Sequence, residues 1–215
     1  MMVRPAAGCL VGLLMAAHVT VAAQEPVRLY AAGSLRVAMT EVGVAFAKSG
    51  GVAVTNVFSA SGLLRERIEK GAPAEVFTSA DMGHPQTLSR AGRSGPVVTF
   101  TRNRLCALAS PSLEVTTSSL LDVLLDPKVR VGSSTLKNDP SGDYTWAMFE
   151  KAEKVRSGAY AALSGKALKL VGGADSPPAP EHRSVYTMLM TEGRADVFIT
   201  YCTNAILAQR EAPGL

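Results

Sequence analysis

The sequence predicts an α/β fold in which mostly parallel sheets are flanked by helices. Between residues 27 and 91, three short apolar runs are each followed by a loop containing Gly or Ser and then by a helical pattern. This strand-loop-helix order is typical of a parallel sheet covered by helices. A second series begins after residue 104, and 47% of all residues are hydrophobic, which suffices for packed cores.

The first series supplies the strands and helices of one domain. Its three predicted strands occupy residues 27–32, 52–57 and 75–78. The helices that follow them are expected at about 35–46, 63–70 and 85–91. In the first helix, Leu35, Met39, Val42 and Phe46 are spaced three or four residues apart, which is the pattern of a helix.

The second series forms the other domain. The extended stretch 97–109 is interrupted at residues 102–104, and we expect the chain to cross between domains there. Further strands are predicted at 129–132, 167–171 and 195–201. Helices are predicted at 119–126, 143–155, 159–164, 184–191 and 204–209, and a loop rich in Pro and Gly occupies 172–182.

Residues 1–23 have the features of a secretory signal peptide. Arg4 supplies the positive charge before an apolar stretch, residues 10–17, that is too short to span a bilayer. Small or short residues precede an expected cleavage after Ala23, and a buried N-terminal helix is the alternative. We therefore expect export to a bacterial periplasm, with a mature chain that begins at Gln24.

Two cysteines, Cys106 and Cys202, remain in the mature chain. An oxidising compartment permits a disulfide between them, and two buried free thiols are the alternative. Neither cysteine belongs to a CxxC motif or a His/Cys cluster, so the sequence has no pattern of a zinc site.

Composition and motifs exclude several classes of function. The 22 Lys and Arg residues are scattered among 18 acidic ones, and aromatic residues make up only 6% of the chain. Neither a basic stripe nor a base-stacking platform is present, so no nucleic-acid partner is expected. The sequence also lacks GxSxG, GxGxxG, HExxH and phosphate-loop motifs, and we expect a protein that is not an enzyme.

Small polar residues gather where predicted strands end and helices begin. Ser34 and Ser61 stand at helix N-termini of the first series, and Ala80 stands in its third loop. Ligands of open α/β sheets bind at these ends, where helix N-termini present free N–H groups. Hydroxyl and N–H donors without charge suit a compact anion. For each serine taken alone, a simple helix cap is the better explanation.

Four blocks of the chain resemble one family, the periplasmic molybdate-binding proteins of bacterial ABC uptake systems. The blocks are "YAAGSL" at 30–35, "FSASGLLRERIEKGAPAEVFTSA" at 58–80, "DPSGDY" at 139–144 and the strand at 196–201. The similarity extends over residues 27 to 210. It implies a two-lobed type II periplasmic binding protein, with lobe 1 at 24–103, lobe 2 at 104–215 and an anion held between them.

The resemblance also implies a binding site. The oxyanion site of the family corresponds here to Ser34, Ser61, Ala80, Ser141, Arg183 and Tyr201. The first two serines would supply hydroxyl and backbone donors, the tyrosine a phenol donor, and the other three backbone N–H groups. Any metal would be held only through the oxygens of the anion, and no cofactor is implied. Arg183 replaces a small apolar residue of the family, and it either faces solvent or adds a cation to the site.

The expected function is capture of molybdate or tungstate by a monomer that delivers the anion to an ABC permease. Another small oxyanion, such as sulfate or a carboxylate, is the first alternative. A secreted hydrolase is a second, although its only mature histidines would be His84 and His182, neither of which is a plausible base near Ser34. A sensor lobe for a membrane partner is a third. Family members continue with a return segment that completes lobe 1, which we expect to be missing after Leu215.

Overall fold

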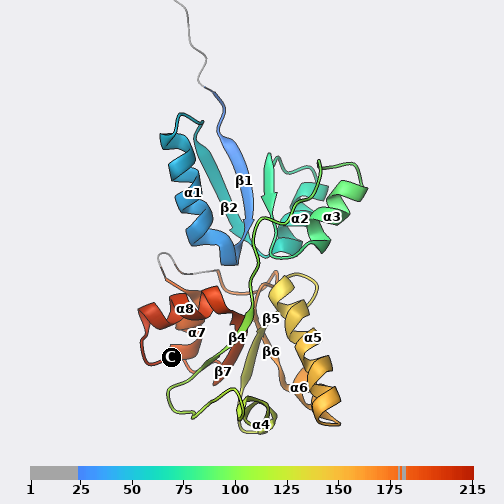
Figure 1. Ribbon diagram of the computed structural model, residues 1–215, viewed down its shortest axis with the longest axis vertical. Helices are drawn as coiled ribbons and strands as arrows, with labels where there is room; N and C mark the ends of the chain where they lie inside the picture. The colour runs from blue at the N-terminus through green and yellow to red at the C-terminus, as the bar shows by residue number, and fades with distance from the viewer. Residues whose placement is uncertain (1–23, 179, 181–182) are drawn as a thin grey trace, which may run out of the picture.

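The computed structural model describes residues 24–215, except for 179, 181 and 182. The predicted signal peptide and His182 therefore lie outside the described residues. Two α/β lobes lie one above the other, and each has its own sheet with helices on both sides (Figure 1). The expected two-lobed α/β architecture is confirmed.

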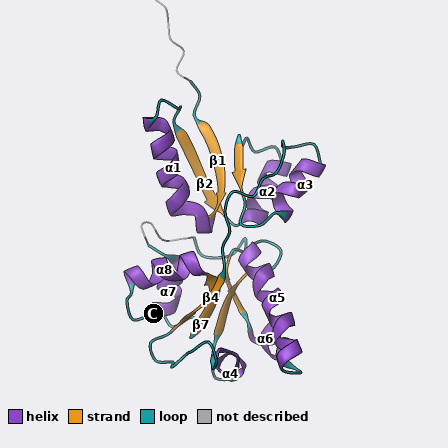
Figure 2. Ribbon diagram, in the orientation of Figure 1, coloured by secondary structure: helices purple, strands orange, loops and turns teal. Residues whose placement is uncertain are grey.

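Lobe 1 contains a three-stranded parallel sheet in the order β2-β1-β3. Its strands are β1 (Val27–Ala32), β2 (Val54–Ser59) and β3 (Val76–Thr78). A short 3-10 helix, η1 (Gly33–Leu35), leads into α1 (Arg36–Lys48), and the other helices are α2 (Ser61–Glu69) and α3 (Gly83–Arg90). Helix α1 lies on one side of the sheet and α2 and α3 on the other (Figure 2).

Lobe 2 contains a four-stranded mixed sheet in the order β4-β7-β5-β6. Strand β4 (Leu105–Ala109) runs antiparallel to β7 (Val197–Tyr201), whereas β5 (Val131–Ser134) is parallel to both β7 and β6 (Leu168–Val171). The helices are α4 (Leu120–Leu125), α5 (Pro140–Val155), α6 (Ala159–Lys166), α7 (Val185–Thr191) and α8 (Cys202–Glu211).

Residues 91–104 contain no helix or strand and carry the chain from one lobe to the other. The sequence predicted an extended stretch over 97–109, but only 105–109 forms a strand, because β4 pairs with β7 over those five residues alone. Helix α5 begins three residues before its predicted start at 143. Asp139 caps it by accepting the Ser141 N–H, and Pro140 occupies the first turn, where a missing N–H costs nothing.

The helix predicted at about 35–46 is confirmed as α1, and several of its apolar residues are exposed. Val42 is 54% exposed and Phe46 is 47% exposed, whereas Gly43 is the one buried residue of this helix. A Cβ built on Gly43 would lie 3.2 Å from Cβ of Val54, so the helix approaches the sheet through its glycine. Close backbone approach at Gly43 turns the valines and the phenylalanine of α1 outward.

The larger cores lie in lobe 2, on the two faces of its sheet. One cluster contains Phe198, Leu189 and Ala208, and the other contains Phe149, Leu163 and Val197. Trp146 packs against Phe149 in the second cluster, with ring centroids 5.4 Å apart.

Cys106 of β4 and Cys202 at the start of α8 form a disulfide with Cα atoms 4.8 Å apart. Of the two states that the sequence left open for these cysteines, the structure shows the bonded one. No helix of the described residues is both long and apolar enough to cross a membrane.

Candidate ligand-binding cleft

A cleft of about 450 Å³ lies between the two lobes. Lobe 1 lines it with the residues that follow β1, β2 and β3, and lobe 2 with the loop 171–178 and with residues of α7, β7 and α8. The carboxyl ends of strands therefore meet here, which is where ligands of open α/β sheets bind. The volume falls within the range of small-molecule sites in proteins.

Four of the six residues that the sequence nominated line this cleft: Ser34, Ser61, Ala80 and Tyr201. Ser34 lies in η1 directly after β1, and Ser61 is the first residue of α2 after β2. Ala80 follows β3, and Tyr201 ends β7 in the opposite lobe. Parallel strands thus bring together residues that are up to 167 positions apart, since 201 − 34 = 167.

Hydrogen bonds already join three of these residues. The Ala80 N–H donates to Ser61 Oγ over 3.1 Å, and the Tyr201 hydroxyl donates to the Ala80 carbonyl oxygen over 3.5 Å. The Ala80 N–H is therefore occupied, contrary to its expected role as a free donor, whereas the Ser61 hydroxyl keeps its own hydrogen to donate. Burial, with Asp139 nearby, raises the pKa of Tyr201, so its phenol remains a donor at neutral pH.

The structure does not bring Ser141 and Arg183 to the cleft lining. Ser141 is buried, and its N–H donates to Asp139 Oδ1 over 3.0 Å, so the helix cap occupies the donor that was expected for the anion. Among the described residues, no group hydrogen-bonds Ser141 Oγ. Arg183 is exposed, and its N–H lies 3.5 Å from the Pro180 carbonyl oxygen.

Charged and aromatic residues that the sequence did not nominate also line the cleft. Arg36 and Arg67 come from lobe 1, and the Arg36 guanidinium lies 4.7 Å from the centre of the Phe58 ring. Lobe 2 contributes Asp139 and Tyr186. The sequence did contain a signal for both arginines. Each lies within the first two turns of a helix that follows a serine loop, and these helices begin at the same edge of the sheet.

A contact near the cleft also joins the lobes. The Gly62 N–H donates to the Asn138 carbonyl oxygen over 2.8 Å. A Cβ on Gly62 would lie 2.7 Å from that oxygen, so only glycine permits this approach. Together with the bond from Tyr201 to Ala80, it joins the two lobes.

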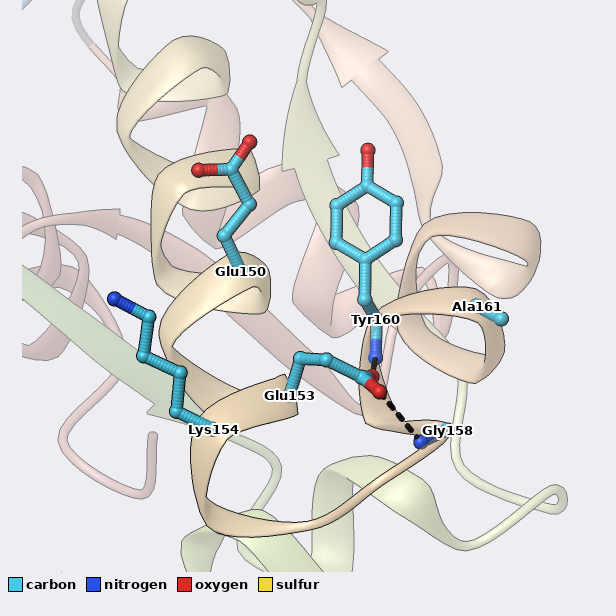
Figure 3. A pocket seen from close by; sticks show the side chains of 6 residues that line it. All are labelled: Glu150, Glu153, Lys154, Gly158, Tyr160 and Ala161. Carbon is cyan, nitrogen blue, oxygen red and sulfur yellow. Dashed lines mark hydrogen bonds between the residues drawn. The ribbon is translucent and has the colours of Figure 1, made fainter.

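A second concavity, of about 500 Å³, lies within lobe 2 between α5 and α6 (Figure 3). The Glu153 carboxylate accepts the Gly158 N–H over 2.9 Å and the Tyr160 N–H over 2.8 Å. These bonds lower the pKa of Glu153 and cap the start of α6. None of the nominated residues lines it, and its acidic group is already paired, so the cleft between the lobes is the better candidate.

Neither a metal cluster nor a catalytic histidine appears at the cleft. Within the described parts of the chain, no three His, Cys, Asp or Glu side chains lie close enough to hold a metal ion. No histidine of residues 24–215, outside the undescribed positions, lines the cleft, and His84 lies on α3. The polar groups that line the cleft include the hydroxyls of Ser34, Ser61 and Tyr201, the guanidinium groups of Arg36 and Arg67, and the carboxyl of Asp139.

Comparison with known proteins agrees with this geometry. The pattern of one family, described as bacterial extracellular solute-binding protein, matches residues 27–215. An uncharacterized protein of Pasteurella multocida, PM1146, is 38% identical over 178 residues, which cover 82% of this chain and 74% of that protein. The molybdate-binding protein ModA of Mycobacterium tuberculosis H37Rv is 32% identical over 117 residues, which cover 50% of this chain and 45% of that protein.

Two solved structures show the same fold at low sequence identity. The sulfate-binding protein SubI of Mycobacterium tuberculosis has a TM-score of 0.67 and 18% identity, and covers 88% of this chain and 69% of its own. The periplasmic molybdate-binding protein of Azotobacter vinelandii has a TM-score of 0.59 and 20% identity, and covers 81% of this chain and 71% of its own. The fold is that of type II periplasmic binding proteins, as the sequence predicted. The chain belongs to the bacterial extracellular solute-binding protein family and resembles its ModA-like members.

Proposed function

We propose that this protein captures molybdate or tungstate in the periplasm and delivers the anion to an ABC permease. The observation that carries this proposal is the convergence of hydroxyl groups from both lobes on one cleft. Ser34 and Ser61 come from lobe 1 at the starts of helices, and Tyr201 comes from lobe 2. A dianion that leaves water needs many oriented donors, and bonds to a charged acceptor are stronger than neutral ones.

Two residues, Ser34 and Ser61, would donate directly, and Tyr201 would do so by turning its hydroxyl from the Ala80 carbonyl oxygen to the anion. Ser61 Oγ accepts the Ala80 N–H, so its own hydrogen remains available to donate in the cleft that the residue lines. The N–H groups of Ala80 and Ser141 are paired, so they would contribute only if the anion replaced Ser61 Oγ and Asp139 Oδ1 as acceptors. The Arg183 side chain is exposed, and we assign it no contact with the anion.

Closure of the lobes would convert binding into a signal for the permease. The bonds Tyr201–Ala80 and Gly62–Asn138 link the lobes beside the cleft. An anion bound there would stabilise the joined arrangement relative to a separated one, and a permease could recognise that difference. This role requires neither catalysis nor a cofactor, and one copy of the chain contains both halves of the cleft.

Calorimetric titration of molybdate, tungstate, sulfate and phosphate tests the proposal. We expect the first two to bind more tightly than sulfate, whose shorter bonds leave some donors out of reach. Ser34→Ala, Ser61→Ala and Tyr201→Phe should each weaken binding about tenfold or more, because one hydrogen bond to a charged ligand contributes about 1.5–3 kcal/mol.

Two control variants sharpen this experiment. Ser164→Ala removes a hydroxyl that bonds the Tyr160 carbonyl oxygen on α6, away from the cleft, and should leave affinity unchanged. Arg183→Ala should also change it little. Absence of heat and of any thermal shift with all four anions would overturn the oxyanion receptor. If sulfate binds more tightly than molybdate, the protein is still an oxyanion receptor, but its ligand is sulfate.

Export is tested separately. We expect the signal peptide to be cleaved after Ala23, because a charged start and a short apolar stretch precede small residues. N-terminal sequencing of the periplasmic protein should then begin at Gln24. Exported protein that retains Met1 would contradict the cleavage.

A further inference from the structure

Asp139 is the one carboxylate among the residues that line the cleft as the structure describes it. It precedes α5 and accepts the Ser141 N–H at Oδ1. Its other oxygen, Oδ2, faces the loop after β6, since a Cβ on Gly172 would lie 2.6 Å from it. Among the described residues, no N–H group donates to Oδ2. A negative group therefore stands in a cleft whose other groups suit an anion.

The charges around Asp139 do not neutralise it. Across the described part of the chain, none of the ion pairs includes Asp139. Asp143 of the same helix adds a second negative charge, while the neutral phenols of Tyr186 on α7 and Tyr201 on β7 face it from lobe 2. Arg36 and Arg67 line the cleft from lobe 1 without pairing to it.

This setting favours a protonated carboxyl. Burial raises the pKa of Asp139 to about 6, with Asp143 acting in the same direction, although the Ser141 N–H and the Ser134 hydroxyl oppose the change. Asp81, in the lobe 1 loop beside Ala80, acts on Tyr201 rather than on Asp139. A dianion bound in the same cleft would disfavour the ionised form further.

We propose that Asp139 is a specificity-determining residue of the cleft, which binds a tetrahedral oxyanion most tightly when one proton lies between the Asp139 carboxyl and the anion. The inference rests on the oxyanion receptor proposed above and names the class of anion it favours. Sulfate and molybdate carry no proton at neutral pH, so the proton must come from solvent and reside on Asp139. Hydrogen phosphate brings its own proton, which an ionised Asp139 can accept as a hydrogen bond.

The consequence is a coupling between anion binding and proton uptake. If only the protonated cleft binds sulfate, the apparent affinity falls with the protonated fraction of the free protein. With a pKa of about 6, affinity for sulfate should fall roughly 50-fold between pH 6 and pH 8. Affinity for phosphate should fall much less over the same interval, because hydrogen phosphate persists across it.

Calorimetry in two buffers of different ionisation enthalpy measures both effects. At pH 7.5 the wild-type protein should take up about one proton per sulfate or molybdate bound, given a pKa of about 6 in the free state. Asp139→Asn should take up none and should bind sulfate more tightly than wild type at pH 8. Asparagine is also a good helix cap, so its oxygen can keep the bond to the Ser141 N–H.

Asp143→Asn is the matched control. It removes a carboxylate of the same helix that accepts the Lys137 N–H over 2.8 Å, and it should retain wild-type proton uptake. Sulfate or molybdate binding by wild type without proton uptake and without dependence on pH would overturn this proposal and leave the receptor intact. Failure of every anion to bind both wild type and Asp139→Asn, from pH 6 to pH 8, would overturn the receptor as well.

Discussion

The two lobes use the same strand-loop-helix units but bury their side chains to different extents. Lobe 2 has a hydrophobic cluster on each face of its sheet and a disulfide that joins β4 to α8. Lobe 1 buries Leu29, Leu64 and Leu88, while Val42 and Phe46 of α1 stay about half exposed. Since apolar burial is the main stabilising contribution in folding, the free energy of unfolding is concentrated in lobe 2.

An ion pair of the same design occurs in both lobes. In lobe 1, the backbone and side chain of Arg28 both donate to the Glu75 carboxylate, which directly precedes β3. In lobe 2, Arg130 does the same with Asp196, which directly precedes β7. The pairs lie at the ends of the strands that are opposite to the cleft. The difference between the lobes therefore lies in their cores and not in how neighbouring strands are joined.

Removing an aromatic side chain should reveal the largest difference in stability between the two lobes. Phe149 is 0% exposed in lobe 2, and Phe149→Ala should cost about 3–5 kcal/mol. Phe46→Ala in lobe 1 should cost much less, because its side chain is already about half in water. Urea unfolding followed by circular dichroism measures both. Equal losses would show that α1 is packed as tightly as α5.

Removing the disulfide should have the next largest effect, and again in lobe 2. Cys106 and Cys202 are separated by 96 positions, and a loop of that length gives about 4–5 kcal/mol in the chain-entropy description. We expect Cys106→Ser with Cys202→Ser to lose about 2–5 kcal/mol, measured as a lower Tm. Two free thiols in unreduced, unfolded wild-type protein would contradict the bond from which the loss is derived.

Asp139 should make stability fall as pH rises. A carboxylate in an ordinary ion pair has the opposite effect. The pKa of Asp139 is raised from 3.8 to about 6, so the unfolded chain releases the proton first and stability falls as pH rises through this interval. The fall should be at most about 3 kcal/mol and complete by about pH 7. Comparing urea midpoints of wild type and Asp139→Asn at pH 4.5 and 7 isolates it. If the difference between the two midpoints is the same at both pH values, the raised pKa of Asp139 is contradicted.

The two arginine ion pairs should contribute least, and similarly in each lobe. The pKa of Glu75 is lowered to about 2, chiefly by hydrogen bonds from Arg28, and that of Asp196 is lowered by Arg130. Their contribution is present above the unfolded pKa and is lost as pH falls below about 4. Both pairs reach solvent, with 21–53% of each side chain exposed, so Glu75→Gln and Asp196→Asn should each lower Tm by a few degrees at most. A much larger loss of Tm for one variant would show that the two ion pairs do not contribute similarly to stability.

Much of the fold was predictable because short apolar runs bounded by Gly and Ser define strands locally. Each predicted strand overlaps an observed one, although β4 is shorter than the extended stretch that contains it. The face that α1 turns toward the sheet did not follow from the sequence, because spacing indicates which residues share a face but not which face packs on the sheet. Gly43, with no side chain, allows the closest approach to Val54 and decides the orientation.

The site was predictable only in part, because it forms where two lobes meet. Ser34, Ser61, Ala80 and Tyr201 stand at strand ends, which the sequence indicates directly. The cap that occupies the Ser141 N–H depends on how Asp139 is oriented, and loop sequence does not determine this. Two short segments of similar sequence, "AEVF" at 74–77 and "ADVF" at 195–198, contain the acidic residues of the two equivalent ion pairs.

The position of Trp146 makes the contrast between the lobes directly observable. It is the only tryptophan of the chain, and it packs against Phe149 within a cluster of lobe 2. Its fluorescence therefore reports on the environment of lobe 2 alone, while tyrosine emission comes from both lobes, through Tyr30 in one and Tyr144, Tyr160, Tyr186 and Tyr201 in the other. Selective excitation of this tryptophan, with no added label, can thus follow the unfolding of lobe 2 by itself.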